Sequence, residues 1–525
     1  MKENSKPMTF NRIALLHIIL LLVVMIFNVA PWYFLMLTVA QLLFVPLTLQ
    51  LILKKENRLY YYFALPAFAA VSILQLTTNT KFDVLFAAIY LLFTFVVALY
   101  GLGRFIRRGF AHLEEFSIDV GMMYLFIGGV WFFASVAEIN TGFPPIITWL
   151  TGIHFHYSAF LLPIFVGFIG RLYKTTIYKV VCTIILISPI VVAIGITFFH
   201  WLEVVSVLLY IIGIYGLIIL TFKTPFTNTL QKYLIRISFG ALGITIIFSL
   251  LYAVRISTVS IDFMLRFHGL FNCILFGLFG VIGWSSTPPL SKEKGWTFPI
   301  SNMRGKYVVG EQILKKNLGI HSYKGLVDNM NMYIPKKSIA PTITHFYENT
   351  TQYRLYSEVH WHNWFKPFAA IYRLISKKVQ QLNLPFSNKQ MEMTGDIVSI
   401  EEGRTKTRAW VRKIDKEVIF VALYSIHQAN DKKYMNIALP LPWSSMVGIL
   451  ELHQQGDNLL LTGNGTTNSD AGIYLAASKY VFKLPLQEQF LIEEIKEGHL
   501  HAKHEMRIFT IPFLTINYVI VIKNE

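Results

Sequence analysis

The segment VVCTIILISPIVVAIGITFF, residues Val180–Phe199, contains no charged side chain. About 20 consecutive apolar residues are needed to cross the hydrocarbon core of a bilayer, and a charge at the centre of such a helix costs about 2.5 to 3.5 kcal/mol. The segment therefore predicts a membrane-spanning helix. Pro189 lies inside it and predicts a kink, because proline removes a backbone donor.

Similar apolar runs recur along the first half of the chain. Ten of them, including Val180–Phe199, have the composition of a spanning helix. The first follows basic residues as a signal sequence does, but it lacks a small-x-small cleavage site, so we interpret it as a retained helix. The ten predicted spans are Ile13–Ala30, Trp32–Leu53, Leu59–Leu76, Val84–Gly103, Ser117–Ile139, Ile153–Gly170, Val180–Phe199, Val204–Phe222, Ile237–Val254 and Phe263–Gly283.

Basic residues are distributed unequally between the two sides of the predicted bundle. Starting with the N-terminal segment, every second connection is basic, and this set carries 17 Lys and Arg. The other connections carry three, namely Lys81, Arg255 and Arg266. The positive-inside rule places the basic set in the cytoplasm. Both termini are therefore predicted to be cytoplasmic.

The overall composition excludes an ordinary soluble enzyme. Of the 525 residues, 54% are hydrophobic and 15% are charged, and the mean hydropathy is +0.50. The net charge of +17 is spread over both halves of the chain. Such a diffuse basic excess favours an anionic lipid surface over nucleic acid, which requires dense basic stripes. Cys182 and Cys273 lie in apolar runs and indicate neither a disulfide scaffold nor a zinc ribbon.

Ionisable residues collect at the predicted outer ends of the spans. Glu138 ends the fifth span, and His154 and His156 begin the sixth. Imidazole and carboxylate groups on one rim are able to bind a divalent metal such as zinc, so these three residues form a candidate metal site. Interfacial polarity at helix ends is the alternative explanation. Additional candidate ligands are His200, Glu203 and His268.

The composition changes after the bundle, for which we assign residues 1–284. A linker and mixed region covers 285–341, and a helical region covers 342–390. The helical region contains an amphipathic basic helix that ends before Pro385. Its apolar face either packs against its own domain or lies on an anionic membrane surface. The apolar stripe is Phe365, Phe368, Tyr372, Ile375, Val379 and Leu382, and the basic residues are Lys366, Arg373, Lys377 and Lys378.

From Met391 the apolar period becomes two, and turn residues separate the runs. The pattern predicts a cytosolic, mostly antiparallel β domain over 391–525, either a curved sheet or a closed barrel, because closure removes exposed edges. A barrel of this size encloses one apolar ligand or has a filled core. The predicted strands are Gly395–Glu401, Thr407–Ile414, Val418–His427, Met435–Leu439, Met446–Leu452, Asn458–Gly463, Gly472–Leu475, Tyr480–Leu486, Phe490–Glu494, Leu500–Ile508 and Phe513–Ile522.

Motifs for cofactors and catalysis are weak in this region. Gly463 and Gly465 lack the third glycine of a dinucleotide loop. His499, His501 and His504 are candidate ligands or bases, but we find no carboxylate or nucleophile in register with them. Catalytic residues therefore stay unassigned.

Three stretches resemble the YndJ-like family of bacilli. They are GIHFHYSAF at Gly152–Phe160, FYENTTQYRLYSEV at Phe346–Val359 and HEMRIFTIPFLTINY at His504–Tyr518. The resemblance also covers WFKPFAAIYRLISKKVQQLNLP and DAGIYL, and so spans most of the chain. It implies a multipass protein of a bacterial cytoplasmic membrane. The family has no established activity, although members are sometimes labelled transporters, and it supplies no catalytic or binding residues.

Three functional hypotheses are consistent with these patterns. The first is a transport or lipid-handling protein whose β domain binds an apolar or anionic ligand. The second is a membrane-embedded, metal-dependent enzyme that uses the outer His and Glu residues. The third is a membrane sensor or scaffold, although ten spans are more than an anchor needs. We find no carboxylate near the predicted bilayer midplane, which weakens proton-coupled transport within the first hypothesis.

The predicted topology is testable with reporter tags. Tags after Glu525 and in the linker near Pro289 are expected to report the cytoplasm, and a tag near Gly142 the outside, because of the asymmetry of 17 to three basic residues. An external signal from the C-terminal tag would contradict an even number of spans.

Overall fold

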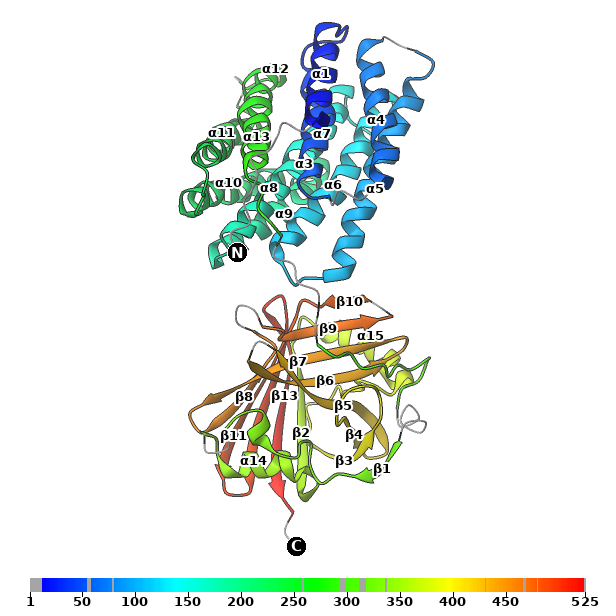
Figure 1. The fold of residues 1–525 in the computed structure, drawn as a ribbon, viewed down its shortest axis with the longest axis vertical. Coiled ribbons are helices and arrows are strands. Elements are labelled where there is room, and N and C mark those ends of the chain that lie inside the picture. The colour runs from blue at the N-terminus through cyan, green and yellow to red at the C-terminus, as the bar shows by residue number, and fades with distance from the viewer. Residues whose placement is uncertain are drawn as a thin grey trace. The chain divides into compact units, whose positions relative to one another are not determined.

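The computed structural model describes residues 12–53, 58–77, 80–256, 259–291, 296, 298–310, 318–335, 338–429, 431–465, 469–478 and 480–523. The chain separates into two compact units. The first unit comprises Met1–Phe105 and His112–Glu293, and the second comprises Ile106–Ala111 and Lys294–Glu525. Figure 1 shows that the first unit is helical and that strands dominate the second.

Seven helices in the described part of the chain are long and apolar enough to cross a membrane. This finding confirms a chain with membrane-spanning helices. The seven are α5 (Asp83–Arg108), α6 (Leu113–Val136), α9 (Thr176–Phe198), α10 (His200–Lys223), α11 (Thr229–Ala253) and two composite helices over Pro145–Leu172 and Ile261–Ser286.

The prediction of ten spans is not confirmed. The first three predicted spans coincide with shorter apolar helices over Ala14–Ile26, Phe34–Gln50 and Tyr62–Leu76. Helix α1 (Arg12–Ile26) ends four residues before the predicted span does, because the chain turns at Asn28, whose side-chain amide donates to the Ala30 carbonyl oxygen at 2.6 Å. Hydropathy alone assigns the apolar neighbours of Asn28, namely Phe27, Val29 and Ala30, to the span although the chain turns there.

The first composite helix contains a π-helical turn. It consists of α7 (Pro145–His156), the π segment η2 (Tyr157–Leu161) and α8 (Leu162–Leu172). Tyr157 in the π segment donates from its hydroxyl to the Met36 carbonyl oxygen at 2.7 Å. Met36 belongs to α2 (Phe34–Val39), so this bond ties the composite helix to the N-terminal part of the bundle.

A buried ion cluster joins three helices of the first unit at one point. Glu115 of α6 is 2% exposed. Its carboxylate accepts from Arg104 Nη2 of α5 at 2.7 Å and from Arg171 Nε and Nη2 of α8 at 2.7 and 2.8 Å. Arg104 also donates to Asp119 at 2.7 Å, and Arg171 donates to the Pro289 carbonyl oxygen at 2.9 Å. The cluster thus fixes α5, α6, α8 and the segment that follows the last helix.

The strands of the second unit confirm the eleven predicted from the period of two, each with small changes at its ends. The described chain also contains two strands before Met391. The strands are β1 (Leu318–Ser322), β2 (Tyr353–Trp361), β3 (Met391–Ile400), β4 (Arg408–Ile414), β5 (Glu417–Ala429), β6 (Lys432–Leu441), β7 (Ser444–Gln455), β8 (Asn458–Thr462), β9 (Gly472–Ala477), β10 (Tyr480–Lys483), β11 (Leu486–Lys496), β12 (His499–Ile508) and β13 (Ile511–Ile522).

The antiparallel sheet closes into a barrel. Its strand order is β7-β6-β5-β4-β3-β2-β13-β12-β11-β8, and β8 pairs again with β7. Strands β9 and β10 extend the sheet from β7, and β1 pairs with β3. Between the two predicted alternatives, a curved sheet and a closed barrel, the structure has the barrel.

The prediction of a helical region over 342–390 is incomplete. Helices α14 (Pro341–Glu348) and α15 (Lys366–Val379) are present, but β2 lies between them. Alternate residues of β2, such as Leu355, Val359 and Trp361, are buried. The period of two extends over only nine residues between two helical patterns, so it was not recognised as a strand.

The barrel wall has an apolar core on each side. The inner core includes Trp361 and Ile516, whereas Val421 and Val447 belong to an outer core. Phe298 and two other residues of the segment before β1 contribute to the outer core. Both faces of β4 to β7 are therefore buried along much of their length, as in sheets that are covered on both sides.

Glu115→Gln is expected to destabilise the first unit, because it removes the carboxylate shared by the buried Arg171 and the partly buried Arg104. Breaking a buried ion pair typically costs about 3 to 5 kcal/mol. Thermal unfolding of the purified full-length protein, followed by tryptophan fluorescence, measures the effect. The control is Asp262→Asn, which removes the exposed Arg266–Asp262 pair and should cost less than about 1 kcal/mol. Equal unfolding temperatures for both variants would contradict a stabilising role for the cluster.

Candidate functional site

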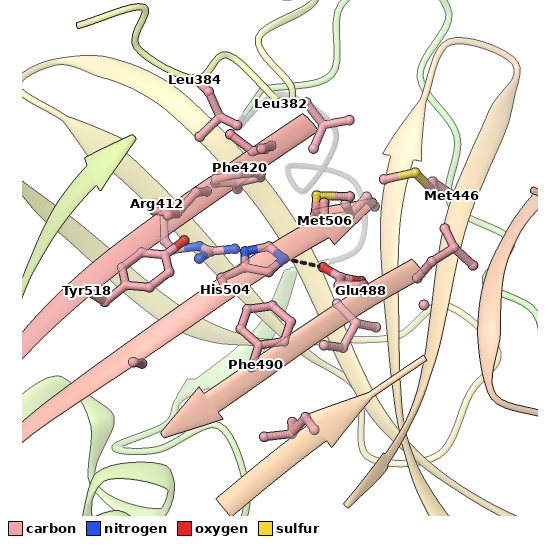
Figure 2. Close-up of a pocket in the computed structure, with 18 of the residues that line it drawn as sticks. Leu382, Leu384, Arg412, Phe420, Met446, Glu488, Phe490, His504, Met506 and Tyr518 are labelled. Atoms are coloured by element: carbon pink, nitrogen blue, oxygen red, sulfur yellow. Dashed lines mark ion pairs between the residues drawn. The ribbon is translucent and has the colours of Figure 1, made fainter. Parts of the chain in front are cut away.

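The barrel interior contains a cavity of about 350 Å³ (Figure 2). Most of its wall is apolar and comes from strands, and Tyr372 of α15 also contributes to it. The volume lies within the range of about 300 to 1,000 Å³ that is usual for small-molecule sites. The apolar lining includes Leu382, Leu384, Phe420, Met446, Phe490 and Met506.

Arg412 of β4 contributes a guanidinium group to the lining of this cavity. It lies over the rings of Trp410 and Phe420, 4.6 and 4.3 Å from their centroids. Among the described residues, Arg412 Nε has no hydrogen-bond partner and no carboxylate pairs with the guanidinium. Arginine stays protonated in proteins, and a charge held away from water is costly without a counter-ion. The cavity is therefore suited to an anionic group.

His504 and Glu488 form a second polar pair in the same cavity. His504 Nε2 lies 2.8 Å from Glu488 Oε1, and the imidazole stacks on Phe490 with the ring centroids 3.8 Å apart (Figure 2). His504 Nδ1 has no hydrogen-bond partner within the described chain. Glu488 thus contacts the imidazole, and the structure pairs no described carboxylate with Arg412.

Two tyrosines supply neutral donors beside the guanidinium. Figure 2 shows the Tyr518 hydroxyl next to Arg412. Burial raises the pKa of Tyr518, although the positive charge of Arg412 opposes this shift. Burial also raises the pKa of Tyr424, which lines the same cavity. Both hydroxyls therefore stay protonated at neutral pH and are able to donate to an anion.

Arg412 and Glu488 were not recognised from the sequence, although a signal for them exists. His504 was named as a candidate ligand or base, but the carboxylate beside it, Glu488, was missed. Inward positions on β12 have even numbers, as Leu500 and Ala502 show by their burial. His504 is in phase with them, whereas His499 and His501 point to the other face. Arg412 and Glu488 are likewise in phase with the apolar inward residues of their strands. A charge in phase with an inward apolar row is the pattern that would have found this site.

The structure separates the members of the predicted metal site. His154 is exposed and its Nδ1 lies 2.6 Å from the Leu150 carbonyl oxygen, whereas His156 is buried. His156 contacts the Gly152 carbonyl oxygen through Nδ1 and the Tyr90 hydroxyl through Nε2, both at 2.8 Å. Both nitrogens of His156 are therefore occupied. Side chains two residues apart on a helix point in different directions, which explains why His154 is exposed and His156 is buried.

The other candidate ligands are also engaged with near neighbours. Glu138 is exposed at the end of α6, and His200 lies 3.1 Å from Glu203. His268 Nδ1 lies 3.0 Å from the Thr245 carbonyl oxygen. The rings of His154 and His268 have centroids 6.3 Å apart. Within the residues that the structure describes, no group of three or more His, Cys, Asp or Glu side chains is arranged to hold a metal ion.

The metal site at Glu138, His154 and His156 stays a prediction, and metal analysis tests it. If it exists, protein purified without a His tag should contain about one equivalent of a divalent transition metal, and His154→Ala with His156→Ala should remove it. A content below about a tenth of an equivalent, unchanged in the double variant, would leave interfacial polarity as the explanation.

Comparisons with known proteins agree with the resemblance noted in the sequence. The family model described as YndJ-like protein matches residues 35–276. The Uncharacterized membrane protein YndJ of Bacillus subtilis (strain 168) is 37% identical over 492 residues, which cover 90% of this chain and 89% of that protein. No solved structure matches the chain significantly. The extent of the similarity, over both the helical unit and the barrel, shows that the chain belongs to the YndJ-like protein family.

Proposed function

We propose that this membrane protein is a lipid-handling protein whose barrel binds one amphiphile with an anionic head and an apolar tail. The observation that carries the proposal is the guanidinium of Arg412, which pairs with no carboxylate among the described residues and lies in a mostly apolar cavity. A carboxylate or phosphate on the ligand would supply the missing charge, and charge-assisted hydrogen bonds of this kind are short and strong.

The remaining lining fits an acyl chain. Met446 and Met506 have flexible thioethers, which adapt to ligands of irregular shape. Each methylene group that leaves water contributes about 0.8 kcal/mol, so a tail of several carbons supplies most of the affinity. The Tyr518 hydroxyl and the ring N–H of His504 would add donors near the head of the ligand.

In the predicted topology the barrel lies in the cytoplasm, and the spanning helices keep it at the membrane. Transport is the more specific form of this hypothesis, because it requires that the bound ligand also move through the helical unit. Sensing differs in that binding would change a contact with another protein. Both begin with occupancy of the cavity, which is the property to test first.

Arg412→Gln is expected to weaken binding of an acyl carboxylate about ten- to a hundredfold, because one charged contact is typically worth about 1.5 to 3 kcal/mol. Native mass spectrometry of the full-length protein should detect the co-purified ligand, and titration with a fluorescent fatty acid in nanodiscs should give the affinity. The matched control is Arg354→Gln, which removes an exposed arginine of β2. Equal affinities for wild type and both variants would refute the role of Arg412.

Gly448→Ile is expected to block the cavity without destabilising the barrel. A Cβ at this lining position meets Glu488 Oε2 and the Ile473 side chain at 3.4 Å, which is an ordinary contact distance. The rest of the new side chain would then occupy space that the tail needs. Loss of fatty-acid fluorescence, with an unfolding temperature equal to that of the outward control Thr394→Ile, is the expected result. Undiminished binding would show that the ligand lies elsewhere.

A further inference from the structure

Helix α15 packs on the barrel through a narrow face. Ala369 and Ser376 are its buried residues, and Phe365 and Val379 at its two ends are partly buried against the cores. Phe368 and Ile375 of the predicted apolar stripe, and Ile371 and Leu374 beside them, are instead open to solvent in the structure. The exposed fractions are 59% for Phe368, 63% for Ile371, 71% for Leu374 and 55% for Ile375. Of the two predicted alternatives, packing against its own domain therefore applies only to the ends of the stripe.

The charge of α15 is entirely basic. The helix carries Lys366, Arg373, Lys377 and Lys378 and no acidic residue. Lys366, Arg373 and Lys377 are seven and four residues apart, a spacing that places them along one edge of the helix. Lys377 lies 3.3 Å from Glu417, and both side chains are exposed. An exposed apolar face with a basic edge is typical of helices that lie in a membrane interface.

Other exposed apolar residues lie at the same end of the barrel. In an antiparallel barrel every second connection returns to one end, so the β2–β3, β4–β5, β6–β7 and β12–β13 connections lie together. The β4–β5 turn, Asp415 and Lys416, is polar. Helix α15 belongs to the β2–β3 connection. Trp364, two residues before it, donates from Nε1 to the Pro512 carbonyl oxygen at 2.8 Å and so ties it to the start of β13. The exposed residues at the β6–β7 and β12–β13 turns are Trp443, Phe509 and Ile511, at 62%, 58% and 56%.

The opposite end of the barrel has a different character. Its β7–β8 and β11–β12 connections contain Gly456 with Asp457 and Glu497 with Gly498, which are ordinary polar turns. Ile495 is a large exposed apolar residue near that end, at 67%. The concentration of aromatic and aliphatic side chains is thus a property of one end, which we name the rim: α15, Trp364, Trp443, Phe509 and Ile511.

The occupant of this surface follows from its charge and from the rest of the chain. Exposed apolar side chains gathered at one end of a domain indicate a protein or membrane contact. The basic edge of α15 is complementary to anionic headgroups, and the barrel is covalently joined to seven helices fit to cross a bilayer. An anionic leaflet therefore satisfies both the apolar and the basic features of the rim.

We propose that the rim inserts into the interface of an anionic lipid leaflet. Tyr372 extends this inference, since it belongs to α15, is 38% exposed and also lines the cavity. The cavity then receives its amphiphile from the leaflet rather than from water, a step that rests on the proposed function of the barrel. Insertion of the rim itself does not depend on a ligand.

Spin labelling of the full-length protein in nanodiscs tests the insertion. Labels are attached at Ile371→Cys on the rim and at Ile495→Cys as the matched exposed control, and the two native cysteines are buried. Collision rates with oxygen and with a water-soluble nickel chelate report the depth of each label. In nanodiscs that contain phosphatidylglycerol, the label at position 371 should meet mainly oxygen, and the label at position 495 mainly nickel.

The charges of α15 provide the second arm of the experiment. Lys366→Gln combined with Arg373→Gln and Lys377→Gln, or nanodiscs of phosphatidylcholine alone, should remove the oxygen excess at position 371. Nickel access at position 371 equal to that at position 495 would overturn the proposal. An immobile label shielded from both reagents would also overturn it, because the rim would then be covered by protein. Arg412→Gln should leave the depth unchanged, so a failure of insertion and a failure of ligand binding are distinguishable.

Discussion

The pairing of β8 with the second half of β7 is the constraint on which the barrel depends. The pairs run from Glu451 with Thr462 to Gln455 with Asn458, whereas the first half of β7 pairs with β9. Strand β7 is long enough to pair with β8 and β9 along the same edge. The sheet therefore closes through β8 and extends outward through β9. Without this closure the inward residues of ten strands would line an open groove, and Arg412 would face water.

Closure of the barrel also gives the two faces of its wall different environments. The outer face of β4 to β7 is covered by its own apolar core. The inner face leaves a cavity of about 350 Å³ and holds polar groups at inward positions. A filled core would have been more stable than one with a half-buried guanidinium, and proteins tend to accept such costs where they bind ligands.

The sequence predicted the secondary-structure elements better than it predicted which side chains come together in the fold. Period-two patterns identified all strands from β3 to β13, because one face of each is apolar. The short β2 between two helices was missed, and hydropathy overestimated the spans near Asn28 because it does not detect turns. The cavity needed three-dimensional knowledge, since Arg412 and Glu488 are far apart in the chain. His154 and His156 point to different sides of their helix, and the presence of two nearby histidines in the sequence does not reveal this difference.

The ion cluster around Glu115 has a consequence for the order in which the helical unit assembles. Arg104 precedes Glu115 closely in the chain, but Arg171 follows it by 56 residues and Ser291, which donates to Glu115 at 2.9 Å, by 176. During synthesis from the N-terminus, the carboxylate of Glu115 therefore first has its nearer arginine, and its last donor arrives only after α13 (Phe279–Ser286) has been made. Completion of this cluster thus marks the end of bundle assembly, and it does so at the segment that leads out of the membrane.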